Sequence, residues 1–98
     1  VLIHEATFAR DDEHLAQRSL HSTAEMAARV ASEAGAGRLI MTHFSPRYAE
    51  GNAVEPNALL REARAVFAAT EMARDFMSVE VPRRHEPTES ASAGADLV

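Results

Sequence analysis

The chain has 98 residues and a formal net charge of −5, from 10 basic and 15 acidic residues. This length allows one small domain, and the acidic balance argues against a stand-alone nucleic-acid module, which would need clustered Lys and Arg. Cysteine is absent, which excludes disulfides and thiolate metal sites and fits a reducing compartment. No apolar run approaches the roughly 20 residues of a membrane span, so we expect a cytoplasmic protein with no membrane partner.

The amino-terminal segment predicts a short buried strand. Residues 1–3 are apolar, and the polar sequence HEAT at 4–7 follows them at the carboxyl end of the strand. The chain opens inside this apolar run without an initiator methionine, so we expect it to be one piece of a longer protein. Residues 11–20 predict at most one or two helical turns.

A helix is predicted directly after His21. Ser22 stands three residues before Glu25, which is the spacing of a capping box, and Gly35 and Gly37 end the helix. Small apolar residues recur on one face at helical spacing, namely Ala27, Val30, Ala31 and Ala34. We therefore expect His21 at the amino terminus of a helix that packs on a sheet through small side chains.

The remaining elements complete an α/β order of strand, helix, strand, helix and strand. Residues 38–42 predict a strand whose nearly continuous apolar run indicates cover on both faces of the sheet. A helix is expected at about 57–69 and a final strand at 75–82. The inner side of this helix carries Leu59, Leu60, Ala63, Val66 and Phe67. Residues 83–98 are polar and rich in Pro, Ser and Ala, and we predict a disordered tail there.

Five histidines occur, at positions 4, 14, 21, 43 and 85, and none has local metal-chelating spacing. His4 and His43 each follow a strand and His21 precedes a helix, so these three imidazoles can meet at the carboxyl edge of one sheet. Taken alone, a residue such as His43 is more often a hydrogen-bonded histidine at a strand end than a metal ligand. Glu5 is either a charge that solvates a loop or a carboxylate that orients an imidazole, with His21 as its partner.

Two polar residues follow His43 in a loop that contains proline. Ser45 and Arg47 are either ordinary surface groups or a hydroxyl and a guanidinium that are presented to a phosphate. Residue types alone leave both interpretations open.

Three stretches together carry a family resemblance: HEATF at 4–8, HSTA at 21–24 and THFSPRY at 42–48. Their order and spacing resemble the C-terminal part of RNase Z, the tRNA 3′-processing endonuclease of the metallo-β-lactamase superfamily. We therefore assign residues 1–82 to the C-terminal portion of a metallo-β-lactamase-like domain. The resemblance implies an α/β fold, namely the C-terminal half of a four-layer αβ/βα sandwich.

The resemblance also implies roles for single residues. His43 corresponds to the family's last zinc-ligand histidine, and Glu5 with His21 corresponds to the pair that delivers a proton to the leaving group. Ser45 and Arg47 correspond to groups that meet RNA phosphate. In the complete enzyme two Zn²⁺ ions are bound, a metal-bound hydroxide attacks the scissile phosphorus of precursor tRNA, and an acid protonates the departing 3′-oxygen. Family members are commonly homodimers.

The chain departs from this family in what it lacks. The H-x-H-x-D-H zinc motif is absent, and one imidazole cannot hold a zinc pair, so we predict that the 98 residues alone are inactive. We also expect the isolated chain to expose the sheet face that the missing half would cover. Two other functions stay open: another metallo-β-lactamase-type phosphodiesterase that acts on small substrates, and a non-enzymatic α/β interaction domain in which the histidines are incidental.

Overall fold

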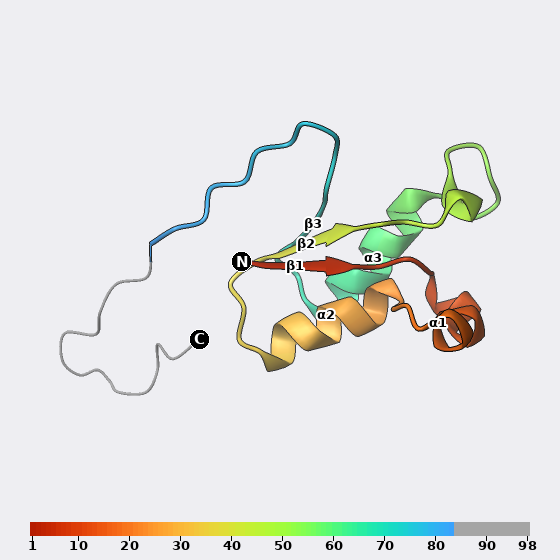
Figure 1. The fold of residues 1–98 in the computed structure, drawn as a ribbon, viewed down its shortest axis with the longest axis horizontal. Coiled ribbons are helices and arrows are strands. Elements are labelled where there is room, and N and C mark those ends of the chain that lie inside the picture. Colours follow the sequence, from red (N-terminus) through yellow and green to blue (C-terminus); the bar gives the residue numbers. More distant parts are fainter. Residues whose placement is uncertain (84–98) are drawn as a thin grey trace.

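Three short parallel strands carry the fold in the computed structural model, which describes residues 1–83 (Figure 1). The elements are β1 (Leu2–Glu5), the 3-10 turn η1 (Arg10–Asp12), α1 (Glu13–Ser19), α2 (Ala24–Glu33), β2 (Leu39–Thr42), the 3-10 turn η2 (Pro46–Tyr48), α3 (Pro56–Val66) and β3 (Thr70–Met72). The predicted order of strand, helix, strand, helix and strand is confirmed, with α1 as the short helix expected within 11–20.

The strands pair in the order β1-β2-β3, with β2 in the centre. The register sets Glu5 beside Thr42 and Met41 beside both His4 and Met72. All strands point the same way, so the segments that follow them gather at one edge of the sheet. This topology brings the HEAT segment and His43 together.

Helices α2 and α3 pack against each other on one sheet face, the face that carries Leu39 and Met41 (Figure 1). Leu39, Met41 and Leu59 are fully buried. The buried stripe of α2 consists of Ala24, Ala27, Ala28 and Ala31. Because alanine extends little from its backbone, this stripe lets α2 approach β1, β2 and α3 closely and fills the core without large side chains.

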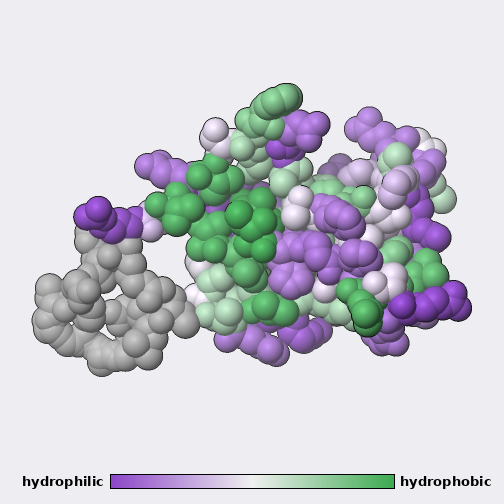
Figure 2. All heavy atoms as spheres, viewed as in Figure 1, coloured by the Kyte–Doolittle hydropathy of each residue, from purple (hydrophilic) through white to green (hydrophobic). Residues whose placement is uncertain are grey.

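The other sheet face is less covered than the apolar run of β2 predicted. Ile3 in β1 is 64% exposed and Val1 is 42% exposed, although Ile40 in β2 is only 3% exposed. Figure 2 shows apolar side chains gathered near the amino-terminal ends of β1 and β2. An exposed apolar area on a sheet is typical of a surface that another protein segment covers.

The start of α2 corrects the predicted capping box by one residue. Thr23 is the N-cap, and its side chain accepts a hydrogen bond from Met26 N at 3.1 Å. Ser22 is not the N-cap, and hydrogen bonding from Ser22 instead helps to lower the pKa of the Glu5 carboxyl group. The predicted inner face of α2 is wrong at Val30, which is 43% exposed, and at Ala34, which is exposed beyond the helix end.

The last strand also lies elsewhere than predicted. The structure places β3 at Thr70–Met72, where Leu39 N donates to Ala69 O at 2.9 Å, and residues 75–82 form a turn and an irregular segment. Phe76 has a left-handed backbone (φ 65°) that turns the chain away from the sheet. The predicted tail at 83–98 lies, apart from residue 83, outside the described residues.

Candidate active site at the carboxyl edge of the sheet

The segment after β1 is hydrogen-bonded to the loop that follows β2. Ala6 N donates to Thr42 O at 2.9 Å, and Ser45 N donates to Thr7 O at 3.0 Å. Ala6 and Thr7 are buried. The HEAT segment and the loop after His43 therefore continue side by side beyond the paired strands.

The same segment is hydrogen-bonded on its other side to the loop before α2. Phe8 N donates to Ser22 O at 3.2 Å, and Ala24 N donates to Phe8 O at 3.0 Å. His21 N donates to Ala16 O at 2.8 Å after Leu20, whose left-handed backbone (φ 64°) ends α1. His21 is thus fixed between the end of α1 and the start of α2, as the sequence predicted for its place before a helix.

These backbone contacts bring Glu5, His21 and His43 together. One ligand-type atom from each residue lies within 4.8 Å of the others. His21 Nδ1 is 3.5 Å from Glu5 Oε1, with side-chain exposures of 37% and 29%. The rings of His21 and His43 are stacked, with centroids 5.1 Å apart and an interplanar angle of 24°. Three residues that are far apart in the sequence therefore form one polar cluster.

Thr7 lies at the centre of this cluster, and sequence reasoning assigned it no role. Its Oγ1 is 2.7 Å from Glu5 Oε1, 2.9 Å from His43 Nδ1 and 3.4 Å from His21 Nδ1. It also lies 2.9 Å from His43 O. No sequence signal marks this role, which becomes visible only in the structure, where Thr7 is 6% exposed and its buried hydroxyl needs polar partners.

Hydrogen bonds stabilise the ionised form of Glu5. Burial alone would raise the pKa of its carboxyl group, but hydrogen bonds from Thr7 and Ser22 lower the pKa below its ordinary value. Glu5 is therefore held as a carboxylate, which is the form that can orient the Nδ1–H group of an imidazole.

The backbone of His43 is in the left-handed region, with φ 64°. This conformation is uncommon for a residue with a side chain and costs on the order of 1–3 kcal/mol, so the surrounding contacts must impose it. Such outliers concentrate at functional sites. The side chain of His43 is exposed at the edge of the cluster, where a ligand can reach it.

Ser45 and Arg47 lie at the start of η2, and their contacts within the protein are structural. Ser45 is the N-cap of η2 and accepts a hydrogen bond from Arg47 N at 3.3 Å. The Arg47 guanidinium is half exposed and lies 3.7 Å from Asp12 Oδ2. Tyr48 is buried, donates to Asp12 and accepts from Ala9 N at 2.8 Å. The loop is thereby fixed to η1, with Arg47 directed partly to solvent.

The other two histidines among residues 1–83 are not part of the cluster. His4 was predicted to share the edge, but its Nδ1 is 2.7 Å from the backbone oxygen of Glu5 instead. Its position inside β1, rather than after the strand, explains the difference. His14 is exposed on α1, and position 85 lies outside the described residues.

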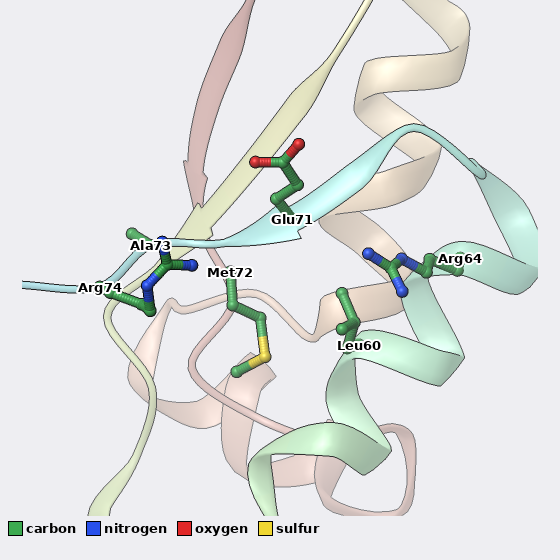
Figure 3. A pocket seen from close by; sticks show the side chains of 6 residues that line it. All are labelled: Leu60, Arg64, Glu71, Met72, Ala73 and Arg74. Carbon is green, nitrogen blue, oxygen red and sulfur yellow. The ribbon is translucent and has the colours of Figure 1, made fainter. Parts of the chain in front are cut away.

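A hollow of about 500 Å³ between α3 and β3 gathers a second set of charged side chains (Figure 3). Its lining consists of Leu60, Arg64, Glu71, Met72, Ala73 and Arg74. Glu71 Oε1 accepts from Arg38 at 2.8 Å, and Arg64 Nε donates to Thr70 O at 2.9 Å. Two of its charged groups thus already have partners in the protein.

Comparison with known proteins gives the cluster a context. The chain is 58% identical over 97 residues to the ribonuclease Z of Nostoc sp., which covers 99% of this chain and 30% of that protein. It is 64% identical to the ribonuclease Z of Nostoc punctiforme over 86 residues, or 88% of this chain. It is 62% identical to that of Rippkaea orientalis over 89 residues, or 91% of this chain. The chain resembles ribonuclease Z.

This match confirms the resemblance to the C-terminal portion of the family that the three motifs indicated. The chain spans less than a third of the ribonuclease Z proteins it matches, 27% to 30% of their length. No protein-family model matches it. Among the helices of residues 1–83, none has the length and apolarity that crossing a membrane requires.

Proposed function

We propose that this chain is the leaving-group side of a zinc-dependent endoribonuclease that removes the 3′ trailer from precursor tRNA. The observation that carries the proposal is the convergence of Glu5, His21 and His43 within 4.8 Å, from three segments that match ribonuclease Z. Identity of 57% to 64% with proteins of that name supports the reaction class.

The donors of the cluster suit zinc in their chemistry, because imidazole nitrogen and carboxylate oxygen are common zinc ligands. Thr7 Oγ1 already lies within hydrogen-bonding distance of Glu5 Oε1 and His43 Nδ1, so His43 would hold a metal through Nε2. When bound, the metal ions supply Lewis-acid stabilisation of the charge that develops on the phosphate. One imidazole is too few for two Zn²⁺ ions, so their other ligands come from outside this chain.

Glu5 and His21 move the proton in this proposal. With the carboxylate 3.5 Å from Nδ1, His21 keeps hydrogen on that nitrogen and presents Nε2 to the substrate. Protonated His21 delivers its Nε2 proton to the departing 3′-oxygen, and the charge of Glu5 stabilises the imidazolium beforehand. General acid catalysis of this kind contributes roughly 10²–10⁴-fold.

Ser45 and Arg47 are proposed to contact the RNA backbone beside the scissile bond. Arg47 is half exposed and its nearest acid, Asp12, is 3.7 Å away, so its guanidinium can exchange that weak contact for a phosphate. Ser45 is fixed next to Thr7 by its backbone N–H. Both residues lie in the segment directly after His43, close to the proposed metal ligand.

The wider setting is also proposed. Residues 1–82 form the C-terminal portion of a metallo-β-lactamase-like αβ/βα sandwich, and residues 83–98 form a disordered tail. The working protein is a cytoplasmic homodimer with precursor tRNA as its partner. The isolated chain is inactive, because most metal ligands are absent and the sheet face around Ile3 is uncovered.

A hybrid protein tests the reaction. In this Nostoc hybrid, the present chain replaces the matching segment of the Nostoc sp. ribonuclease Z, to which it is 58% identical. We expect the zinc-loaded hybrid to remove the 3′ trailer from precursor tRNA and the isolated 98-residue chain to leave the RNA intact. Cleavage of a small phosphodiester without trailer removal would support the alternative phosphodiesterase, and cleavage of tRNA by the isolated chain would overturn the predicted inactivity.

A further inference from the structure

We propose that Thr7 is a positioning residue whose single hydroxyl joins the proton-delivering pair to the metal-binding histidine. This inference rests on the proposed function and extends it to a residue that contacts neither substrate nor metal. It follows from the geometry around Thr7 Oγ1, which lies within 3.4 Å of groups on Glu5, His21 and His43.

The hydroxyl has one proton to donate and lone pairs to accept with. Glu5 Oε1 at 2.7 Å and His43 O at 2.9 Å are both acceptors, so only one of them receives this proton. The carboxylate is the closer acceptor, and a hydrogen bond to an ionised group is about twice as strong as a neutral one. Thr7 therefore donates to Glu5.

With its proton directed to Glu5, Thr7 Oγ1 can only accept from the nitrogen of His43 that lies 2.9 Å away. That nitrogen, Nδ1, must then carry hydrogen, which leaves the lone pair of the neutral ring on Nε2. A metal-binding histidine usually has its second ring nitrogen fixed by a carboxylate or carbonyl. In this site the carboxylate of Glu5 acts on His43 through a threonine hydroxyl.

The arrangement gives one carboxylate two tasks. Glu5 Oε1 lies 3.5 Å from His21 Nδ1 and receives the Thr7 proton, so it orients His21 directly and His43 indirectly. Thr7 is 6% exposed and its backbone oxygen accepts from Ser45 N, so the hydroxyl has little freedom to move. The tautomer of His43 thus depends on a group that belongs to the neighbouring loop.

The test compares Thr7→Val with Thr7→Ser in the Nostoc hybrid. Valine keeps the shape and removes the hydroxyl, whereas serine keeps the hydroxyl and removes a methyl group. We measure zinc affinity by competition with a chelator, kcat and KM on precursor tRNA, and the thermal midpoint. We expect Thr7→Val to weaken zinc binding about 10- to 100-fold and to lower kcat with KM little changed, and Thr7→Ser to stay close to the parent.

Two outcomes would overturn the inference. If Thr7→Val binds zinc as the parent does, the hydroxyl does not fix His43. If Thr7→Ser loses as much affinity as Thr7→Val, the methyl group and not the hydroxyl is what matters. Thr7→Ala replaces the valine variant if that protein does not fold. The zinc measurement keeps its meaning even if the parent hybrid fails to cleave tRNA, in which case the proposed reaction fails separately.

Discussion

The carboxyl edge of the sheet and the hollow between α3 and β3 both gather charged side chains, but they use them differently. At the edge, Glu5, His21 and His43 share one threonine hydroxyl and remain partly accessible. In the hollow, Glu71 pairs with Arg38 and the guanidinium of Arg64 binds a backbone oxygen. The first arrangement leaves ring nitrogens available to a ligand, whereas in the second two of the charged groups already have partners in the protein.

The two regions differ in how their charged groups are assembled. The hollow between α3 and β3 is concave, but Glu71 in it forms an ordinary ion pair with Arg38 and Arg64 donates to a backbone oxygen (Figure 3). The edge cluster is built from the end of β1, the loop before α2 and the loop after β2, and it holds His43 in a strained backbone conformation. Convergence of distant residues and strain distinguish the two regions better than concavity does.

The largest effect should come from His43. We expect His43→Ala in the Nostoc hybrid to lose bound zinc and to lower kcat/KM by more than about 100-fold, the upper range for residues that only support a metal ligand. Metal analysis and a precursor tRNA cleavage assay measure both. His14→Ala is the matched control, because His14 is exposed on α1 and away from the cluster. If His43→Ala kept its zinc and activity, the edge cluster would have no more catalytic role than the hollow between α3 and β3.

The next effect should come from His21. His21→Ala should keep zinc and lower kcat by roughly 10²–10⁴-fold, because it removes the acid but not the metal ligand. Glu5→Gln should also lower kcat, since a neutral amide no longer stabilises the imidazolium that lies 3.5 Å away. Rates and zinc content of both variants are compared with those of the parent. Loss of zinc in His21→Ala would make His21 a ligand and contradict the separation of roles.

A smaller effect concerns the contact that fixes the loop at 45–48 to η1. Tyr48→Phe removes the hydroxyl that binds Ala9 N and Asp12, and we expect it to cost about 1–2 kcal/mol of stability in the hybrid. Chemical denaturation measures this loss. Zinc binding should not change, because within residues 1–83 the Tyr48 hydroxyl hydrogen-bonds Ala9 and Asp12 and not the cluster residues. A large loss of zinc in this variant would mean that the loop and the cluster are one unit.

The same tyrosine gives a pH test in the isolated chain. Burial, followed by the hydrogen bond to Asp12, raises the pKa of Tyr48 to about 12. A raised pKa adds stability that is complete below pH 10, the ordinary value, and is lost as the pH rises from there through about 12. Tyr48 is the one tyrosine of the chain, so ultraviolet absorbance reports its phenolate alone. A midpoint near the ordinary value, equal to that in urea, would show that this contact does not form without the rest of the protein.

Sequence patterns predicted those helices and strands that have a clear apolar periodicity and recognisable flanking residues. Strand β2 and helix α3 were found from apolar runs, and the meeting of His21 with His43 followed from strand order. Strand β3 was missed because Thr70–Met72 is too short for an alternating pattern and forms through pairing with β2. The position of β3 is therefore set by tertiary contacts and not by its local sequence.

The role of Thr7 at the centre of the cluster could not be predicted either, for a related reason. A threonine after a strand is an ordinary residue by composition, and its role depends on two loops that approach it from elsewhere in the chain. Ser22 was misassigned in the same way, since Glu5 competes with the helix start for its hydroxyl. Local rules identify which groups can cap or bond, but the fold selects which partner each group receives.

The smallest effect should come from the hollow between α3 and β3. The hydrogen bond from Arg38, followed by the charges of Arg38, Arg64 and Arg74, lowers the pKa of the Glu71 carboxyl group. We expect Glu71→Gln in the hybrid to leave kcat and KM for precursor tRNA unchanged, because exposed ion pairs contribute little and the site lies elsewhere. Cleavage at low and moderate salt measures this. If the released arginines instead lowered KM, and did so more strongly at low salt, the hollow would be an RNA-binding surface and the contrast between the two regions would fail.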